Sequence, residues 1–249
     1  MAEYWKLVIL FIIGIAAGII NVNAGGGSSI TLPALIFMGL DSAVANGTNR
    51  IGILVQTFFS VASFRKQKHH EFRKSLTLVL FALPGAVAGA LISVRLSDDS
   101  FKKILGFVMI AIVLTILFSG KKNRTRSEKI NKKKEVLIYP AMVAIGFYGG
   151  FIQIGVGFLL IASLYHILKL SLVKVNMHKV FIILIYTIPA LLVFIITKNI
   201  DWKFGVVLAS GMALGGWWGA KIVVIGGEKI IKYILAFAVF LMSIKLLLF

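Results

Sequence analysis

Two glycine-rich interruptions of apolar sequence, one in each half of the chain, constrain the fold most strongly. The first is Gly14-x-x-x-Gly18-Ile-Ile-Asn21-Val-Asn23-Ala-Gly25-Gly26-Gly27, and the second is a weaker copy, Gly146-x-x-x-Gly150-Phe-Ile-Gln153-Ile-Gly155-Val-Gly157. A polar break inside an apolar segment lets a membrane protein present backbone groups to a solute, and paired breaks indicate where a transporter binds it. The repeat predicts a chain made of two related halves.

The composition places these breaks in a membrane. The chain is 59% hydrophobic and 14% charged, with a mean hydropathy of +0.97, far more apolar than an average soluble domain. Apolar runs such as 76–94 and 230–249 reach the length of about 20 residues that a helix needs to cross the hydrocarbon core. We therefore expect an all-α polytopic membrane protein that lies in a lipid bilayer.

Each half divides into five apolar segments. In the first half they are 6–22, 28–40, 51–64, 75–94 and 104–119, and in the second half 136–154, 158–168, 180–197, 204–225 and 230–249. We expect a first repeat at 1–119, a linker at 120–135 and a second repeat at 136–249. Because the second segment of each half is so short, the first two segments of each half should be broken or re-entrant around the glycine-rich loop. Whether 28–40 and 158–168 span or re-enter stays open.

The linker carries much of the positive charge. The formal net charge is +18. Eight cations lie between the two halves: Lys121, Lys122, Arg124, Arg126, Lys129, Lys132, Lys133 and Lys134. The positive-inside rule predicts a cytoplasmic linker, and an odd number of segments per half then makes the halves inverted repeats. The same cations could contact anionic lipid, whereas their position argues against nucleic-acid binding.

Acidic residues avoid the apolar segments. All nine lie at segment edges or in connectors: Glu3, Asp41, Glu71, Asp98, Asp99, Glu128, Glu135, Asp201 and Glu228. Proton and cation carriers commonly place a carboxylate within the bundle, so its absence favours an anionic solute. The chain has no cysteine and no histidine cluster with metal-ligand spacing, so we expect neither a metal nor a cofactor.

A polar cluster precedes the third segment of each half. In the first half this cluster is Asn46-Gly47-Thr48-Asn49-Arg50, and in the second half it is Asn176-Met177-His178-Lys179. We expect each cation to lie at a helix N-terminus, whose N–H groups and partial positive charge attract an oxyanion. Both cations could instead mark helix ends at the membrane surface, with side chains that reach the water.

Together, the two breaks and the two clusters define the candidate binding residues. Paired small residues such as Gly14 and Gly18 serve helix packing instead. The asparagines and the glutamine could also cap the broken backbone, and the histidine could carry a proton. The candidates are Asn21, Asn23, Gly25, Gly26, Gly27, Thr48, Asn49, Arg50, Gln153, Gly155, Gly157, His178 and Lys179.

One stretch of the first half also resembles a known family. It runs from Gly18 through Gly25-Gly26-Gly27-Ser-Ser-Ile-Thr31-Leu-Pro33 to Gly47-Thr48-Asn49-Arg50, and it resembles the TauE/SafE sulfite exporter family of membrane permeases. The second half departs from the family pattern, because Asn176-Met177-His178-Lys179 stands where a small residue and Thr-Thr-Lys are usual.

The resemblance implies an inner-membrane secondary transporter that exports a small anion such as sulfite, sulfoacetate or another organosulfonate. An integral-membrane enzyme or a membrane assembly component without transport activity is the alternative. An enzyme would need a nucleophile with its base, or a set of metal ligands, and the sequence offers neither.

Overall fold

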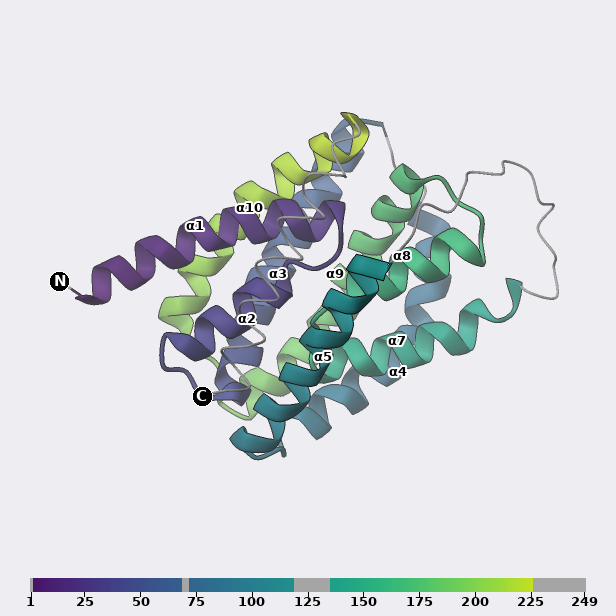
Figure 1. Cartoon of the computed structure of the whole chain (residues 1–249). Coiled ribbons are helices and arrows are strands. Elements are labelled where there is room, and N and C mark those ends of the chain that lie inside the picture. The colour runs from purple at the N-terminus through teal and green to yellow at the C-terminus, as the bar shows by residue number, and fades with distance from the viewer. Residues whose placement is uncertain (1, 69–71, 119–134, 226–249) are drawn as a thin grey trace.

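The computed structural model describes residues 2–68, 72–118 and 135–225, and within these ranges the protein is entirely helical (Figure 1). The first half contains α1 (Ala2–Asn23), α2 (Ser28–Phe37), α3 (Ser42–Lys66), α4 (Phe72–Ser93) and α5 (Asp98–Phe118). The second half contains α7 (Ile138–Phe151), α8 (Val156–His166), α9 (Leu172–Ile196) and α10 (Trp202–Ile225). The expected segment 230–249 and nearly all of the linker lie outside the described residues.

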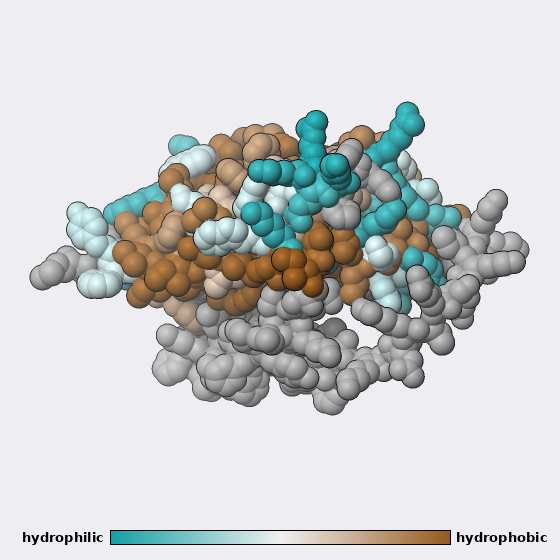
Figure 2. Space-filling model, turned by 90° about the horizontal axis from the view of Figure 1, so that it is seen from above, coloured by the Kyte–Doolittle hydropathy of each residue, from teal (hydrophilic) through white to brown (hydrophobic). Residues whose placement is uncertain are grey.

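Four of these helices are long and apolar enough to cross a membrane. They contain the spans Tyr4–Asn23, Arg73–Ser93, Leu172–Ile196 and Trp202–Ile225. Large apolar side chains remain exposed on them, among them Leu80 and Val206, and Figure 2 shows hydrophobic groups over much of one face. An apolar surface of this extent requires lipid around it. The expected polytopic membrane protein is confirmed.

The prediction was wrong about where two helices begin. The third segments were expected to start at 51 and 180, whereas α3 starts at Ser42 and α9 at Leu172, so each polar cluster lies inside its helix. A helix bonds its own backbone groups, and buried polar side chains can therefore stay helical if neighbouring helices supply partners. The lack of apolar residues at 46–50 consequently does not mark a loop.

The first helix of each half packs against the fourth helix of the other half. Thus α1 lies along α10, and α7 lies along α4. A Cβ atom on Gly18 would lie 2.9 Å from Gly215 Cα, and one on Gly85 would meet the α7 backbone at Phe147 N, 2.6 Å away. The small residues therefore let helix backbones touch, as predicted from their spacing.

Enlarging one of these glycines should destabilise the protein. We expect Gly18→Leu to lower the free energy of unfolding by about 1 to 3 kcal/mol, because the α10 backbone cannot move away from the added atoms. The measurement is the midpoint of thermal unfolding in detergent. Ala16→Leu is the matched control, since Ala16 is exposed on the same helix. Equal midpoints for the two variants would contradict the close crossing.

The helices that follow the breaks are short. With 10 and 11 residues, α2 and α8 are each about 15 Å long, half of the roughly 30 Å hydrocarbon core. Figure 1 shows α2 turning back along α1 after the first break. Helix ends therefore meet inside the bundle, where their backbone groups need partners.

Candidate functional site

The two glycine breaks are in direct contact. A Cβ atom on Gly25 would collide with the backbone of Gly157, and one on Gly157 would collide with the backbone of Gly25. Gly25 also has a φ of +86°, a conformation that favours glycine. The expectation that the breaks of the two halves face each other is thus confirmed for these two residues.

Both helices that leave the breaks begin without a side-chain cap. Gly27 is the N-cap of α2 and Gly155, with a φ of +70°, is the N-cap of α8. Gly26 accepts a hydrogen bond from Ser29 N through its carbonyl oxygen. Helix N-termini present N–H groups and a partial positive charge, so the junction of the breaks is suited to an anion. All of the predicted break glycines are buried.

Arg50 reaches from α3 to the break of the other half. Its Nη1 donates to Gly149 O at 3.1 Å and to Gln153 Oε1 at 3.0 Å, and its Nη2 donates to Gly150 O. The guanidinium also lies over the ring of Phe194, 4.8 Å from its centroid. Because the C-terminal carbonyls of a helix lack intrahelical partners, this cation caps the end of α7.

Lys179 makes the corresponding connection in the opposite direction. Its Nζ donates to Asn21 O at 3.0 Å and to Val22 O at 2.7 Å, both at the end of α1, and to Asn176 Oδ1 at 2.6 Å. The side chains of Lys179 and Arg50 are both fully buried. Each cation therefore caps the broken helix of the half to which it does not belong.

The predicted position of the two cations at helix N-termini is wrong. Arg50 is the ninth residue of α3 and Lys179 the eighth of α9. Their full burial also excludes the alternative that they mark helix ends at the membrane surface. The two side chains instead reach the C-terminal ends of α7 and α1, where the partial negative charge of a helix C-terminus favours a cation.

The predicted amides of the breaks bond to neighbouring helices. Asn21 Nδ2 donates to Gln56 Oε1 at 2.5 Å, which joins α1 to α3. Asn23 Nδ2 donates to Ile19 O at 2.8 Å and to Gly219 O at 3.2 Å. These contacts hold the end of α1 in place.

Of the first cluster, Thr48 faces away from the breaks, because its Oγ1 accepts a hydrogen bond from Asp201 N at 2.9 Å, just before α10. Asn49 faces α2 instead, where its Oδ1 accepts from Thr31 Oγ1 at 2.6 Å. Asn49 Nδ2 is buried and has no partner among the described residues. Asn49 thus stays a candidate ligand on geometric grounds, and Thr48 does not.

His178 turns toward α4. Its Nδ1 lies 2.6 Å from Ser75 Oγ, and both side chains are buried. The imidazole therefore joins α9 to the start of α4, while the neighbouring Lys179 reaches α1. The structure does not bring His178 to the contact between the glycine breaks.

Sequence reasoning missed a polar contact behind Arg50. Gln153, with a φ of +63°, donates from Nε2 to the hydroxyl of Tyr186 at 3.1 Å while its Oε1 accepts from Arg50. Tyr186 and the cation–π partner Phe194 lie in an apolar stretch of α9, where no sequence signal distinguishes them from ordinary core residues. Together they fix the orientation of the guanidinium.

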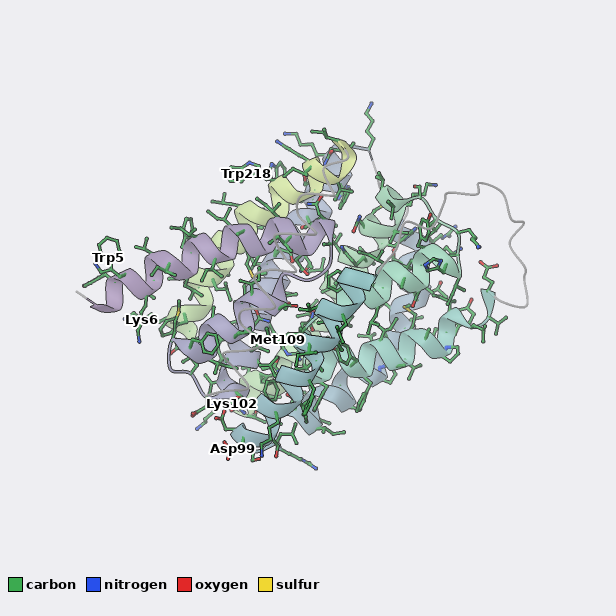
Figure 3. All side chains as sticks on the ribbon, viewed as in Figure 1. Trp5, Lys6, Asp99, Lys102, Met109 and Trp218 are labelled. Carbon is green, nitrogen blue, oxygen red and sulfur yellow. The ribbon has the colours of Figure 1, made fainter. Side chains whose placement is uncertain are left out.

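No described carboxylate lies at this site. The ion pairs of the described residues are Lys102 with Asp98, at the start of α5, and Lys74 with Glu135. Figure 3 shows Asp99 and Lys102 at the edge of the molecule. Within the described ranges, three or more His, Cys, Asp or Glu side chains never gather closely enough to hold a metal ion.

Comparison with known proteins identifies a family that matches nearly the whole chain. The model of the sulfite exporter TauE/SafE family matches residues 10–246. A "Probable membrane transporter protein" of Haemophilus influenzae is 29% identical over 96% of this chain and 94% of its own length. The "Probable membrane transporter protein YfcA" of Escherichia coli K12 is 27% identical over 96% of this chain and 88% of its own.

A relative of lower identity also covers most of the chain. The "Probable membrane transporter protein YunE" of Bacillus subtilis is 25% identical over 87% of this chain and 88% of its own length. No solved structure matches. The family match covers both glycine breaks and both buried cations. The chain therefore belongs to the sulfite exporter TauE/SafE family, a family of membrane transporters rather than of enzymes.

Proposed function

We propose that the protein is a secondary transporter that exports a small anion, such as sulfite, sulfoacetate or another organosulfonate, across the inner membrane. Arg50 carries this proposal: it is fully buried against the second break, and no described carboxylate pairs with it. The solute would bind beside Arg50, against the backbone N–H groups that open α2 and α8.

The electrostatics of this position favour an anion. Removing a charge from water costs several kcal/mol unless an opposite charge or well-placed hydrogen bonds offset that cost. Arg50 has three carbonyl-type oxygens and an aromatic ring beside it, which are dipoles rather than charges. Buried cations of this kind in a membrane protein commonly mark a solute pathway. A bound anion would supply the missing charge, and a cation would be repelled.

Inverted repeats would give this site access to both sides of the membrane. The reciprocal packing of α1 on α10 and of α7 on α4 supports such a symmetry, as do the crossed caps of Arg50 and Lys179. Alternating access would then consist of one half rocking against the other around the contact between the breaks. In this topology the basic linker and the neighbouring ends of α3 and α10 face the cytoplasm.

Uptake by the purified protein tests the proposal. In proteoliposomes preloaded with unlabelled sulfite, we expect radiolabelled sulfite to exchange into the lumen at a rate well above that of protein-free vesicles. Sulfoacetate should compete with it if the two anions share the site, whereas choline should not. Exchange of choline instead of either anion would contradict an anion transporter.

A further inference from the structure

The two buried cations make reciprocal contacts, yet their hydrogen-bonding capacities differ. An ammonium carries three N–H groups, and Lys179 Nζ has three oxygens within 3.0 Å: Asn21 O, Val22 O and Asn176 Oδ1. These acceptors can take every N–H that the side chain offers. To bind a solute, Lys179 would have to release the end of α1.

Arg50 retains donors after capping α7. A guanidinium carries five N–H groups, and Arg50 uses two on Nη1 and one on Nη2. Its Nε is fully buried and finds no acceptor among the described residues. Nε and Nη2 lie on one edge of the guanidinium plane, and arginine commonly binds two oxygens of an oxyanion along such an edge.

We propose that the two cations have different roles at the site, an inference that rests on the proposed function. Lys179 is a positioning residue that fastens the end of α1 to α9 and does not contact the solute. Arg50 fastens the end of α7 and also binds the anion, through Nε–H and the remaining N–H of Nη2. The sequence suggested that the two cations are equivalent. They would then be equivalent only in capping a helix, not in binding the anion.

Each cation caps a helix of the other half, so removing one cation should change the structure of the opposite half. Removing Arg50 leaves Gly149 O and Gly150 O without their donor, although these atoms are about 100 positions away in the sequence. Removing Lys179 has the same effect on Asn21 O and Val22 O. A buried carbonyl that loses its donor destabilises the local structure, so each variant should loosen the break of the opposite half.

Amide hydrogen exchange in lipid nanodiscs, without any solute, measures this effect. We expect Lys179→Met to speed exchange in 19–27 by roughly tenfold, and Arg50→Met to do the same in 147–157. Lys174→Met and Arg65→Met are the controls, because Lys174 and Arg65 are exposed on the same two helices. Faster exchange confined to the neighbourhood of each substituted residue would overturn the crossed caps.

Transport kinetics then separate positioning from binding. We expect Lys179→Arg to keep the KM for sulfite within about twofold of the parent, and Lys179→Gln to lower the maximal rate with little change in KM. Arg50→Lys should raise the KM roughly tenfold or more, because the two-donor edge is lost. If Lys179→Gln raised the KM as much as Arg50→Lys does, both cations would contact the solute and the division of roles would be wrong.

The two experiments distinguish failure of this inference from failure of the proposed function. Hydrogen exchange needs no solute, so its pattern decides whether the crossed caps exist even if the parent protein transports no anion. Absence of anion transport by a parent protein with intact caps would overturn the binding role of Arg50 together with the proposed function.

Discussion

Gly157→Ala is expected to abolish anion transport while the protein still inserts in the membrane. A Cβ atom at this position would lie less than 3.0 Å from Gly25 Cα, with backbone on both sides of the contact. The two breaks would have to separate, which would displace the starts of α2 and α8 together with the N–H groups that they present. Gly25→Ala should fail similarly, because its φ of +86° adds backbone strain to the same collision.

Sulfite exchange in proteoliposomes measures this effect, and we expect a loss of at least about a hundredfold, because small displacements of a binding site have large effects. Gly205→Ala is the matched control. A Cβ atom on Gly205 would also meet an atom closer than 3.0 Å, but that atom is Ile51 Cδ1 at the end of a flexible side chain. Normal transport by Gly157→Ala would show that contact between the breaks is unnecessary for function.

The architecture was predictable because the membrane limits the choices. Helices that span a bilayer need long apolar stretches, and these appear in the sequence as uninterrupted runs such as 204–225, which α10 confirms. Close helix crossings need small residues at a spacing of four, so Gly14 and Gly18 identified the contact face of α1 before its partner was known. Inverted symmetry and the sidedness of the linker stay predictions.

The starts of α3 and α9 were not predictable in the same way. A run such as Asn46 to Arg50 has no apolar periodicity, and on its own it resembles a loop. Its partners include Ser93, Phe151 and residues of the second break, which become neighbours only after the whole bundle has formed. Local sequence reports local preferences, whereas these polar residues are helical because of tertiary contacts.

The candidate site was predicted in its components but not in its connections. The sequence identified both breaks and both cations as related features, and the structure places Arg50 and Lys179 at the breaks. It could not show that each cation caps the helix of the opposite half, because pairing across about 100 or more residues leaves no local pattern. Tyr186 and Phe194 were not predicted because they lie in an apolar stretch of α9, where they resemble ordinary core residues.

Arg50→Ala has the second large expected effect. The substitution removes the buried positive charge at the second break, together with two hydrogen bonds to the end of α7 and one to Gln153. We expect sulfite transport to fall at least about a hundredfold, because charge-assisted hydrogen bonds are worth roughly 1.5 to 3 kcal/mol each. Arg65→Ala should transport like the parent, since Arg65 is exposed in the last turn of the same helix.

Binding and transport of sulfite by these two variants, compared at equal amounts of folded protein, test the central claim most directly. Folded protein is measured by size-exclusion chromatography, so that a loss of stability is not mistaken for a loss of function. The account predicts that Arg65→Ala retains the parent affinity and rate, and that Arg50→Ala loses both. Parent-like affinity in folded Arg50→Ala would contradict an anion site at this residue.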